Sequence, residues 1–262
     1  MEIVAYFVIC LGASLLGAVC GIGGGIIIKP LLDAIGMFEF STINFMSCCT
    51  VLSMSFFSVV ISKREEEWID KKKTFLLAMG AALGGIAGKI MLKHAVHWTE
   101  SEEVVGYLQA FFLLIMTLGT LCYMLFKAGI KTRKVINPIT CIGIGLALGM
   151  LSSFLGIGGG PINLVILSYF FSMDTKEATK NSLYIILYSQ LAGILQMLFT
   201  HSFPVFDVRI LLLMMLGGVG GGYLGRRWNQ RLKVEVVNRL FVFLMVFIIL
   251  INIYNVYIFS KV

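Results

Sequence analysis

A glycine-rich segment occurs twice in this chain, and it constrains the fold more than any other feature. The first copy reads GIGGGIIIKP from Gly21 to Pro30, and the second reads GIGGGPINLV from Gly156 to Val165. A shift of 135 positions, from 21 to 156, superimposes the two copies and also aligns Ser47 with Ser182. Glycine costs roughly 1 kcal/mol relative to alanine inside a helix. Glycine runs within long apolar segments therefore indicate an internal duplication in which each copy contains a broken helix.

The composition predicts a membrane protein. The chain is 58% hydrophobic and 13% charged, whereas about 25% of the residues in soluble domains are charged. A membrane-spanning helix needs about 20 apolar residues. Long apolar stretches cover residues 3–20, 42–62, 74–92, 104–126, 135–155, 175–200, 208–224 and 240–259, and shorter ones cover 26–35 and 161–171. We therefore predict an all-α polytopic membrane protein with about eight long hydrophobic helices, located in the cell (plasma or inner) membrane.

The duplication and the basic residues together predict the topology. We assign residues 1–134 to a first membrane repeat and 135–262 to a second, within one transmembrane domain. If the eight long segments simply alternated across the membrane, the loops would carry about eleven basic residues on one side and nine on the other. If each glycine run is the tip of a hairpin, the split becomes about sixteen against four. Cytoplasmic loops are enriched in Lys and Arg, which favours hairpins meeting near the midplane, inverted repeats and both termini outside.

The simple alternation stays open, because the stretch 3–20 is long enough to cross the membrane alone. Only Glu2 precedes this stretch, so we expect it to belong to the mature fold and not to a signal peptide. The six cysteines lie in apolar segments without metal-ligand spacing, and we predict neither a cofactor nor a metal site. We assign His94, His97 and Trp98 to an interfacial loop.

The glycine runs are candidate anion-binding sites. Backbone N–H groups at the start of a helix have no partner in the helix, and the positive end of the helix dipole favours an anion. The alternative is close packing of helices, since small residues let two backbones touch. Because two matching copies occur, we favour substrate binding by the backbone of six glycines, namely Gly23, Gly24, Gly25, Gly158, Gly159 and Gly160.

Polar side chains near the glycine runs are further candidates. Lys29 lies in the first half-helix, where it could attract an anion, reach the interface or pair with Asp33 at i,i+4 spacing. Asn163 lies two residues after Pro161 and could bind a ligand oxygen or cap the break. Two polar helices complete the set, one with Ser47 and the other with Asn181 and Ser182. By contrast, we interpret the glycines at 80–88 and 217–225 as helix-packing faces.

The chain resembles the sulfite exporter TauE/SafE family over essentially its full length. The resemblance rests on both glycine motifs, on the stretch KEATKNSL from Lys176 to Leu183, and on two basic residues that follow later glycine clusters, Lys89 and Arg226. The resemblance implies a membrane protein that moves sulfite, sulfonates or related organic anions. It also implies roles for the two glycine triplets, Ser47 and Ser182. This chain departs from the pattern at Val165, where a proline is usual, and at Lys29, where an apolar residue is expected.

The leading hypothesis is a secondary transporter that exports or imports small sulfur oxyanions by alternating access. An anion channel is the nearer alternative, because half-helix dipoles can also line a pore, and an intramembrane enzyme is the more distant one. The chain has no Walker A motif, so we do not expect it to hydrolyse ATP, and we predict that it is not an enzyme. The expected partners are a small anionic substrate and the lipid bilayer, without nucleic acid. A homo-oligomer, the direction of flux and the coupling ion are left open.

Overall fold

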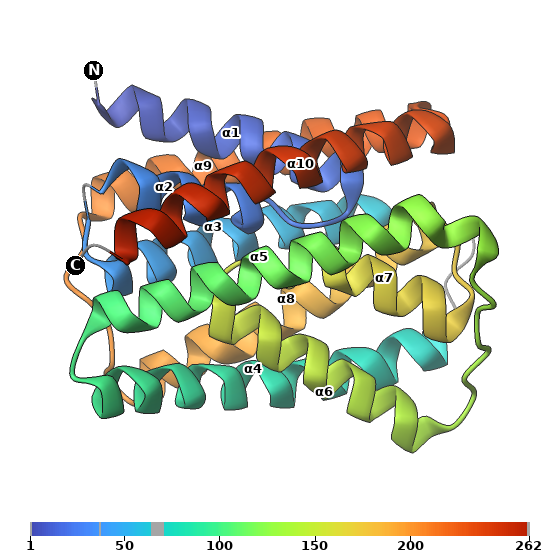
Figure 1. Cartoon of the computed structure of the whole chain (residues 1–262), viewed down its shortest axis with the longest axis horizontal. Coiled ribbons are helices and arrows are strands. Elements are labelled where there is room, and N and C mark those ends of the chain that lie inside the picture. Colours follow the sequence, from blue (N-terminus) through green and yellow to red (C-terminus); the bar gives the residue numbers. More distant parts are fainter. Residues whose placement is uncertain (1, 37, 64–70, 261–262) are drawn as a thin grey trace.

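The computed structural model describes residues 2–36, 38–63 and 71–260, and these residues form ten α-helices, one 3-10 helix and no strand (Figure 1). Seven helices of this described part are long and apolar enough to cross a membrane: Phe40–Ile61, Lys72–Thr99, Glu102–Phe126, Pro138–Leu155, Thr175–Phe199, Val208–Arg231 and Val234–Phe259. The prediction of an all-α, multi-pass membrane protein is therefore confirmed, with seven candidate spans in place of about eight.

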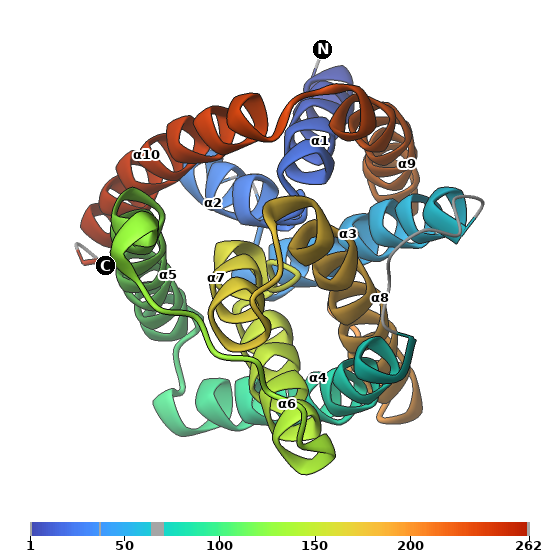
Figure 2. The same ribbon diagram turned by 90° about the vertical axis from the view of Figure 1, so that its right-hand side faces the viewer.

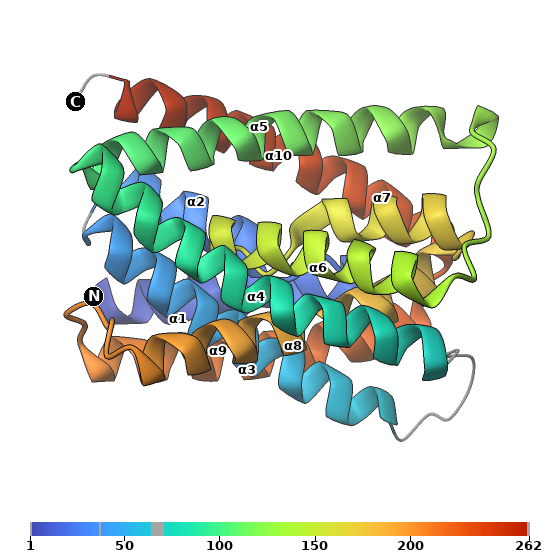
Figure 3. The same cartoon turned by 90° about the horizontal axis from the view of Figure 1, so that it is seen from below.

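The first half of the chain begins with a hairpin. Helix α1 (Glu2–Cys20) runs from the end of the molecule that holds the N-terminus to its middle, and α2 (Gly25–Ile35) returns to the same end (Figure 1). Helices α3 (Phe40–Lys63), α4 (Lys71–Thr99) and α5 (Glu102–Phe126) then run along the whole length of the molecule (Figure 3). The stretch 3–20 thus ends at mid-depth, as the hairpin alternative predicts, and its apolar helix spans only Val4–Cys20.

The second half repeats this order from the opposite end. After the 3-10 helix η1 (Lys127–Gly129) and an extended linker, α6 (Pro138–Leu155) runs to the middle and α7 (Gly160–Phe171) returns (Figure 3). Helices α8 (Thr175–Phe199), α9 (Val208–Arg231) and α10 (Val234–Phe259) follow. Both termini lie at one end and the basic linker between α5 and α6 lies at the other (Figure 1). The basic cluster at 63–73 falls partly outside the described residues. The domain assignment and the inverted relation between the halves stay predictions.

The two halves interlock instead of packing as separate bundles. Helix α4 of the first half packs on α6 and α8, and α9 of the second half packs on α1 and α3. Seen along the long axis, α5 and α10 lie side by side at one edge (Figure 2), and they also contact each other directly. The predicted packing faces are confirmed. A Cβ at Gly88 would overlap the Met150 carbonyl of α6, and one at Gly221 would lie 2.7 Å from the Leu15 nitrogen of α1.

One sequence-based assignment is wrong. His94, His97 and Trp98 do not lie in a loop but in the last turns of α4, which extends to Thr99. The assignment was wrong because these side chains end the apolar pattern of the sequence, which we interpreted as the end of the helix. The helix continues because the tail of an interfacial helix can be polar without losing its backbone hydrogen bonds.

Candidate functional site

The two glycine turns meet in the middle of the molecule. All residues from Gly21 to Gly25 and from Gly156 to Gly160 are buried. A Cβ at Gly25 would lie 2.6 Å from the Ile157 carbonyl oxygen, and one at Gly23 would lie 3.6 Å from the Gly158 carbonyl oxygen. Gly23 and Gly158 have φ angles of 76° and 77°, a region that side-chain-bearing residues rarely adopt. The sequence therefore needs glycine here both for the turn and for the contact between the turns.

Helices α3 and α8 hold the turns through contacts that repeat between the halves. Each helix contributes a small polar residue and an aliphatic residue two turns later, and both contact the turn of the opposite half. The shift of 135 positions that relates the glycine motifs also relates these contacts. The pairs are Asn44 with Gly156, Thr179 with Gly21, Val51 with Gly158, and Ile186 with Gly23. The duplication is therefore visible in the packing around the turns as well as in the sequence.

The second helix of each hairpin begins without a side-chain cap. Gly24 precedes α2 and Gly159 precedes α7, and neither has a side chain to accept the first N–H groups. Helix α8, in contrast, begins with Asp174 and Glu177 in a capping box. Two uncapped positive ends in the interior provide N–H donors and a favourable potential for an anion.

The turns are closed in this structure. The cavity that touches Gly159 has a volume of about 10 Å³ and an apolar lining, which is no more than the smallest space that holds a water molecule.

Three of the predicted polar residues are buried on the helices that form or contact the turns. The Nδ2 atom of Asn163 donates a hydrogen bond to Ser182 Oγ at 3.3 Å, so the structure brings these two residues together. Asn163 Oδ1 and Ser47 Oγ are buried without a hydrogen-bond partner among the described residues. A buried polar atom without a partner costs about 1–3 kcal/mol. These atoms are therefore candidates for binding a ligand when the turns open.

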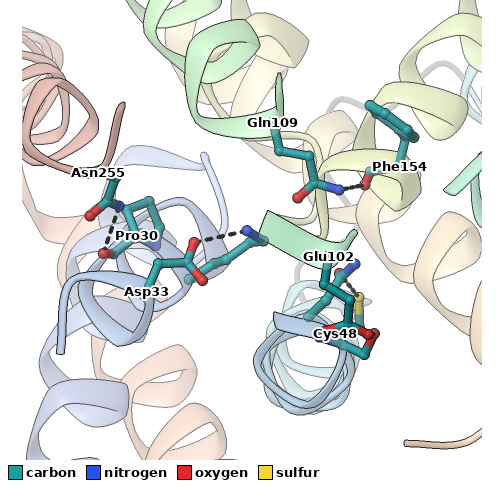
Figure 4. A network of polar contacts seen from close by, with 10 residues as sticks. Pro30, Asp33, Cys48, Glu102, Gln109, Phe154 and Asn255 are labelled. Carbon is teal, nitrogen blue, oxygen red and sulfur yellow. Dashed lines mark hydrogen bonds and ion pairs between the residues drawn. The ribbon is translucent and has the colours of Figure 1, made fainter. Parts of the chain in front are cut away.

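Lys29 and Asn181 have partners away from the turns. The Lys29 ammonium forms an ion pair with Asp33 at 2.9 Å and lies 4.8 Å from the centre of the Phe40 ring. Figure 4 shows this pair on α2, with Asp33 labelled. Asn181 accepts a hydrogen bond from Thr74 at 2.6 Å on the neighbouring α4. The pairing alternative for Lys29 is therefore present in the structure, and the ligand roles of both residues stay predictions.

Sequence reasoning missed several buried polar residues. Lys89 is only 4% exposed and donates to Cys48 Sγ at 3.2 Å (Figure 4). Gln109 lies on α5, within the long apolar stretch 104–126, and its Nε2 atom donates to the Phe154 carbonyl at 2.5 Å (Figure 4). The sequence signal that could have identified them is a single polar residue within an otherwise apolar span.

Arg226 is the counterpart of Lys89 in the second half. It is 1% exposed and donates to Asn229 Oδ1 at 3.3 Å. Asn229 in turn donates to the Val19 carbonyl oxygen at 2.6 Å, at the C-terminal end of α1. Both halves thus bury a cation directly after a glycine packing face.

A cavity of about 330 Å³ opens at the end of the molecule that holds the termini, and we call it the outer cavity. Helices α3, α4, α5 and α8 and the loop after α8 form its walls. Its polar lining residues are Glu39, Ser41, Asn44, Lys89, Lys93, Glu102, Gln196 and Ser202. Ser41 donates both its backbone N–H and its hydroxyl to the Glu102 carboxylate. Asn44 also contacts Gly156, so the outer cavity ends beside the second glycine turn.

Comparison with known proteins gives one family and one curated relative. The sequence model of the family described as Sulfite exporter TauE/SafE matches residues 6–251. The relative is a protein of Bacillus subtilis (strain 168) named "Probable membrane transporter protein YunE". It is 24% identical over 260 residues, which cover 90% of this chain and 92% of the relative. No solved structure matches this chain.

Proposed function

Because the chain belongs to the sulfite exporter TauE/SafE family, we propose that it is a secondary transporter that carries small sulfur oxyanions, such as sulfite or sulfonates, across the membrane by alternating access. The observation that carries the proposal is the meeting of two uncapped half-helix starts, α2 and α7, beside buried polar side chains. The resemblance seen in the sequence and the geometry of the glycine turns support the same site.

The chemistry of an oxyanion matches this site. Sulfite and sulfonates present several oxygen atoms and one or two negative charges, so they need several donors and a positive potential. Two half-helix N-termini supply both without a full cation, which is a common design in transporters with broken helices. Ser47 Oγ adds a buried hydroxyl that has no hydrogen-bond partner among the described residues. A site without a full charge at its centre also releases the anion more readily.

The accessibility of the site fits a carrier. The outer cavity ends at Asn44, and the turns behind it are closed. Under the positive-inside rule the end with the basic linker faces the cytoplasm, so this cavity faces outside. A rearrangement of the helices around the turns would close this cavity and open the opposite side, and the anion would move while bound at the turns.

Flux into proteoliposomes tests the proposal, with sulfite, thiosulfate, taurine, sulfoacetate and carboxylate analogues as the panel. Replacing a glycine is a poor probe, because a Cβ at Gly24 would lie 2.8 Å from Ser14 Oγ and 2.9 Å from its Cα atom. Ser47→Ala removes one hydroxyl without filling space. Since a hydrogen bond to a charged group contributes about 1.5–3 kcal/mol, we expect kcat/KM for the transported anion to fall by about 10–100-fold.

Ser55→Ala is the matched control. Ser55 lies two turns further along α3, is equally buried, and donates its hydroxyl to the Leu52 carbonyl of its own helix at 3.0 Å. We expect this variant to transport normally. Equal losses in both variants, or no flux of any sulfur oxyanion by the native chain, would contradict the proposal. Accumulation against a gradient identifies a carrier, whereas single-channel conductance would identify the anion channel.

A further inference from the structure

The outer cavity contains a buried cation that no carboxylate of the described residues neutralises. Lys89 lines the cavity and is 4% exposed. The ion pair seen among the described residues joins Lys29 to Asp33, and Lys89 instead donates to Cys48 Sγ at 3.2 Å. A charge held at membrane depth is costly, and it is usually paired or part of a ligand pathway. A neutral sulfur atom is a weak acceptor and leaves most of this cost uncompensated.

Lys89 is connected to the glycine turns through α3. Cys48 is one helical turn after Asn44, and its thiol contacts Asn44 Oδ1 at 3.7 Å. Asn44 lines the cavity with Lys89 and also contacts Gly156. The Asn44 side chain therefore lies between the cavity with its cation and the second glycine turn.

A structural role for Lys89 is the alternative. Its side-chain stem lies against Gly193 of α8, where a Cβ would be 3.1 Å from Lys89 Cγ and 3.0 Å from Ser153 Oγ. Ser153 belongs to the last turn of α6, and the C-terminal end of a helix attracts cations. However, the hydrogen bond of the ammonium goes to α3 and the side chain lines an open cavity. Both features favour contact with a ligand over capping of α6.

We propose that Lys89 binds the transported anion at the inner end of the outer cavity, as a station before the glycine turns. The inference rests on the proposed function and adds to it a full positive charge and a second binding position. A small divalent or monovalent oxyanion fits a cavity of about 330 Å³. The oxygens of the anion would accept hydrogen bonds from the Lys89 ammonium. The buried charge would thereby gain a counter-ion that the described residues do not supply within ion-pair distance.

The test measures anion-dependent thermal stability of the purified full-length chain in detergent. Sulfite is titrated against sodium chloride of equal ionic strength, and methanesulfonate is titrated separately. A ligand that binds the folded state raises the melting temperature in a saturable way. We expect Lys89→Gln to weaken apparent sulfite affinity by at least about tenfold, as for the loss of a hydrogen bond to a charged group, and we expect Lys89→Arg to keep saturable binding.

Lys93→Gln controls for general electrostatics. Lys93 lies one turn further along α4, is exposed and donates to Ser202 at the mouth of the cavity. If only the long-range potential mattered, its removal would weaken sulfite binding as much as Lys89→Gln. We expect a change of less than about twofold, since exposed charges are screened by salt. Should Lys89→Gln fail to fold, Lys89→Met keeps the apolar stem against Gly193 and takes its place.

The remaining outcomes overturn the proposal. They are native-like sulfite affinity in Lys89→Gln, equal losses in the two lysine variants, or a native chain that neither sulfite nor methanesulfonate stabilises. A lower melting temperature in chloride with an unchanged sulfite shift would assign Lys89 to the end of α6. Flux separates the two claims. Sulfite binding that depends on Lys89, without any flux, would support the Lys89 site and refute the proposed transport. Sulfite flux together with native-like binding in Lys89→Gln would support transport and refute the Lys89 site.

Discussion

The candidate role of Asn163 depends on the groups that surround its side chain. Its Nδ2 atom donates to Ser182, its Oδ1 atom is buried without a partner among the described residues, and it lies beside Gly159. The sequence identified it because it follows Pro161 in a glycine motif. Lys89 was harder to recognise, because a base after glycines looks like the end of a membrane span. Its burial results from the packing of α4 against α6 and α8, which is a tertiary effect.

Asn163→Asp places a carboxylate of nearly the same shape at the start of α7. We expect flux of sulfite to fall by at least about tenfold, because like charges at a shared site repel each other. The melting temperature should change little, since negative charge near a helix N-terminus is favourable. Flux in proteoliposomes and thermal unfolding in detergent measure the two effects separately.

The control for this change is Asn181→Asp. It introduces the same charge on α8, where the side-chain oxygen accepts from Thr74, away from the turns. If the anion binds at the turns and not at Asn181, flux in this variant stays close to native. If Asn181→Asp abolishes flux and Asn163→Asp does not, Asn181 is the ligand and the placement of the site is wrong.

At the scale of helices, apolar length predicted the elements well because lipid satisfies no backbone hydrogen bonds, so every span must be helical. Glycine faces predicted close packing but not the partner helix. A Cβ at Gly84 would overlap the backbone of α6, and one at Gly145 on α6 would overlap the Leu77 carbonyl of α4. Any of several helices could have packed on the glycine face of α4, and only the three-dimensional structure shows that α6 is the partner.

Gly84→Ala tests this packing. The added methyl group meets the Leu146 carbonyl and not a flexible side chain, so α4 and α6 must separate. We expect a loss of about 1–3 kcal/mol in stability, measured by thermal or denaturant unfolding in detergent. The matched change is Gly119→Ala on α5, where nothing lies within 4 Å. There alanine should be neutral or stabilise the helix by up to about 1 kcal/mol. Equal effects at the two positions would refute the packing explanation.

At the scale of the whole molecule, the distribution of basic residues predicted that the chain turns back at the glycine runs, which helix lengths alone did not predict. Length marks α6 as a candidate span, yet α6 stops in the middle and the chain returns through α7 (Figure 3). The hairpin alternative predicted this, because it places the basic loops at one end. The packing of α4 on α6 and of α9 on α1 could not be predicted. A duplicated sequence shows which helices each half contains, but it does not show which helix of one half packs on which helix of the other.

Impermeant thiol labelling in intact cells tests the topology. Thr132 lies in the basic linker, and His201 lies in the loop after α8 at the end with the termini. Because basic loops stay in the cytoplasm, we expect His201→Cys and Ser260→Cys to react from outside. Thr132→Cys should react only after the membrane is permeabilised. The native chain is the reference, since five of its six cysteines are buried and Cys122 lies within α5. Labelling of Thr132→Cys and His201→Cys from the same side would mean that the hairpin of α6 and α7 crosses the membrane, and the two glycine turns could then not form one central site reached from the outer cavity.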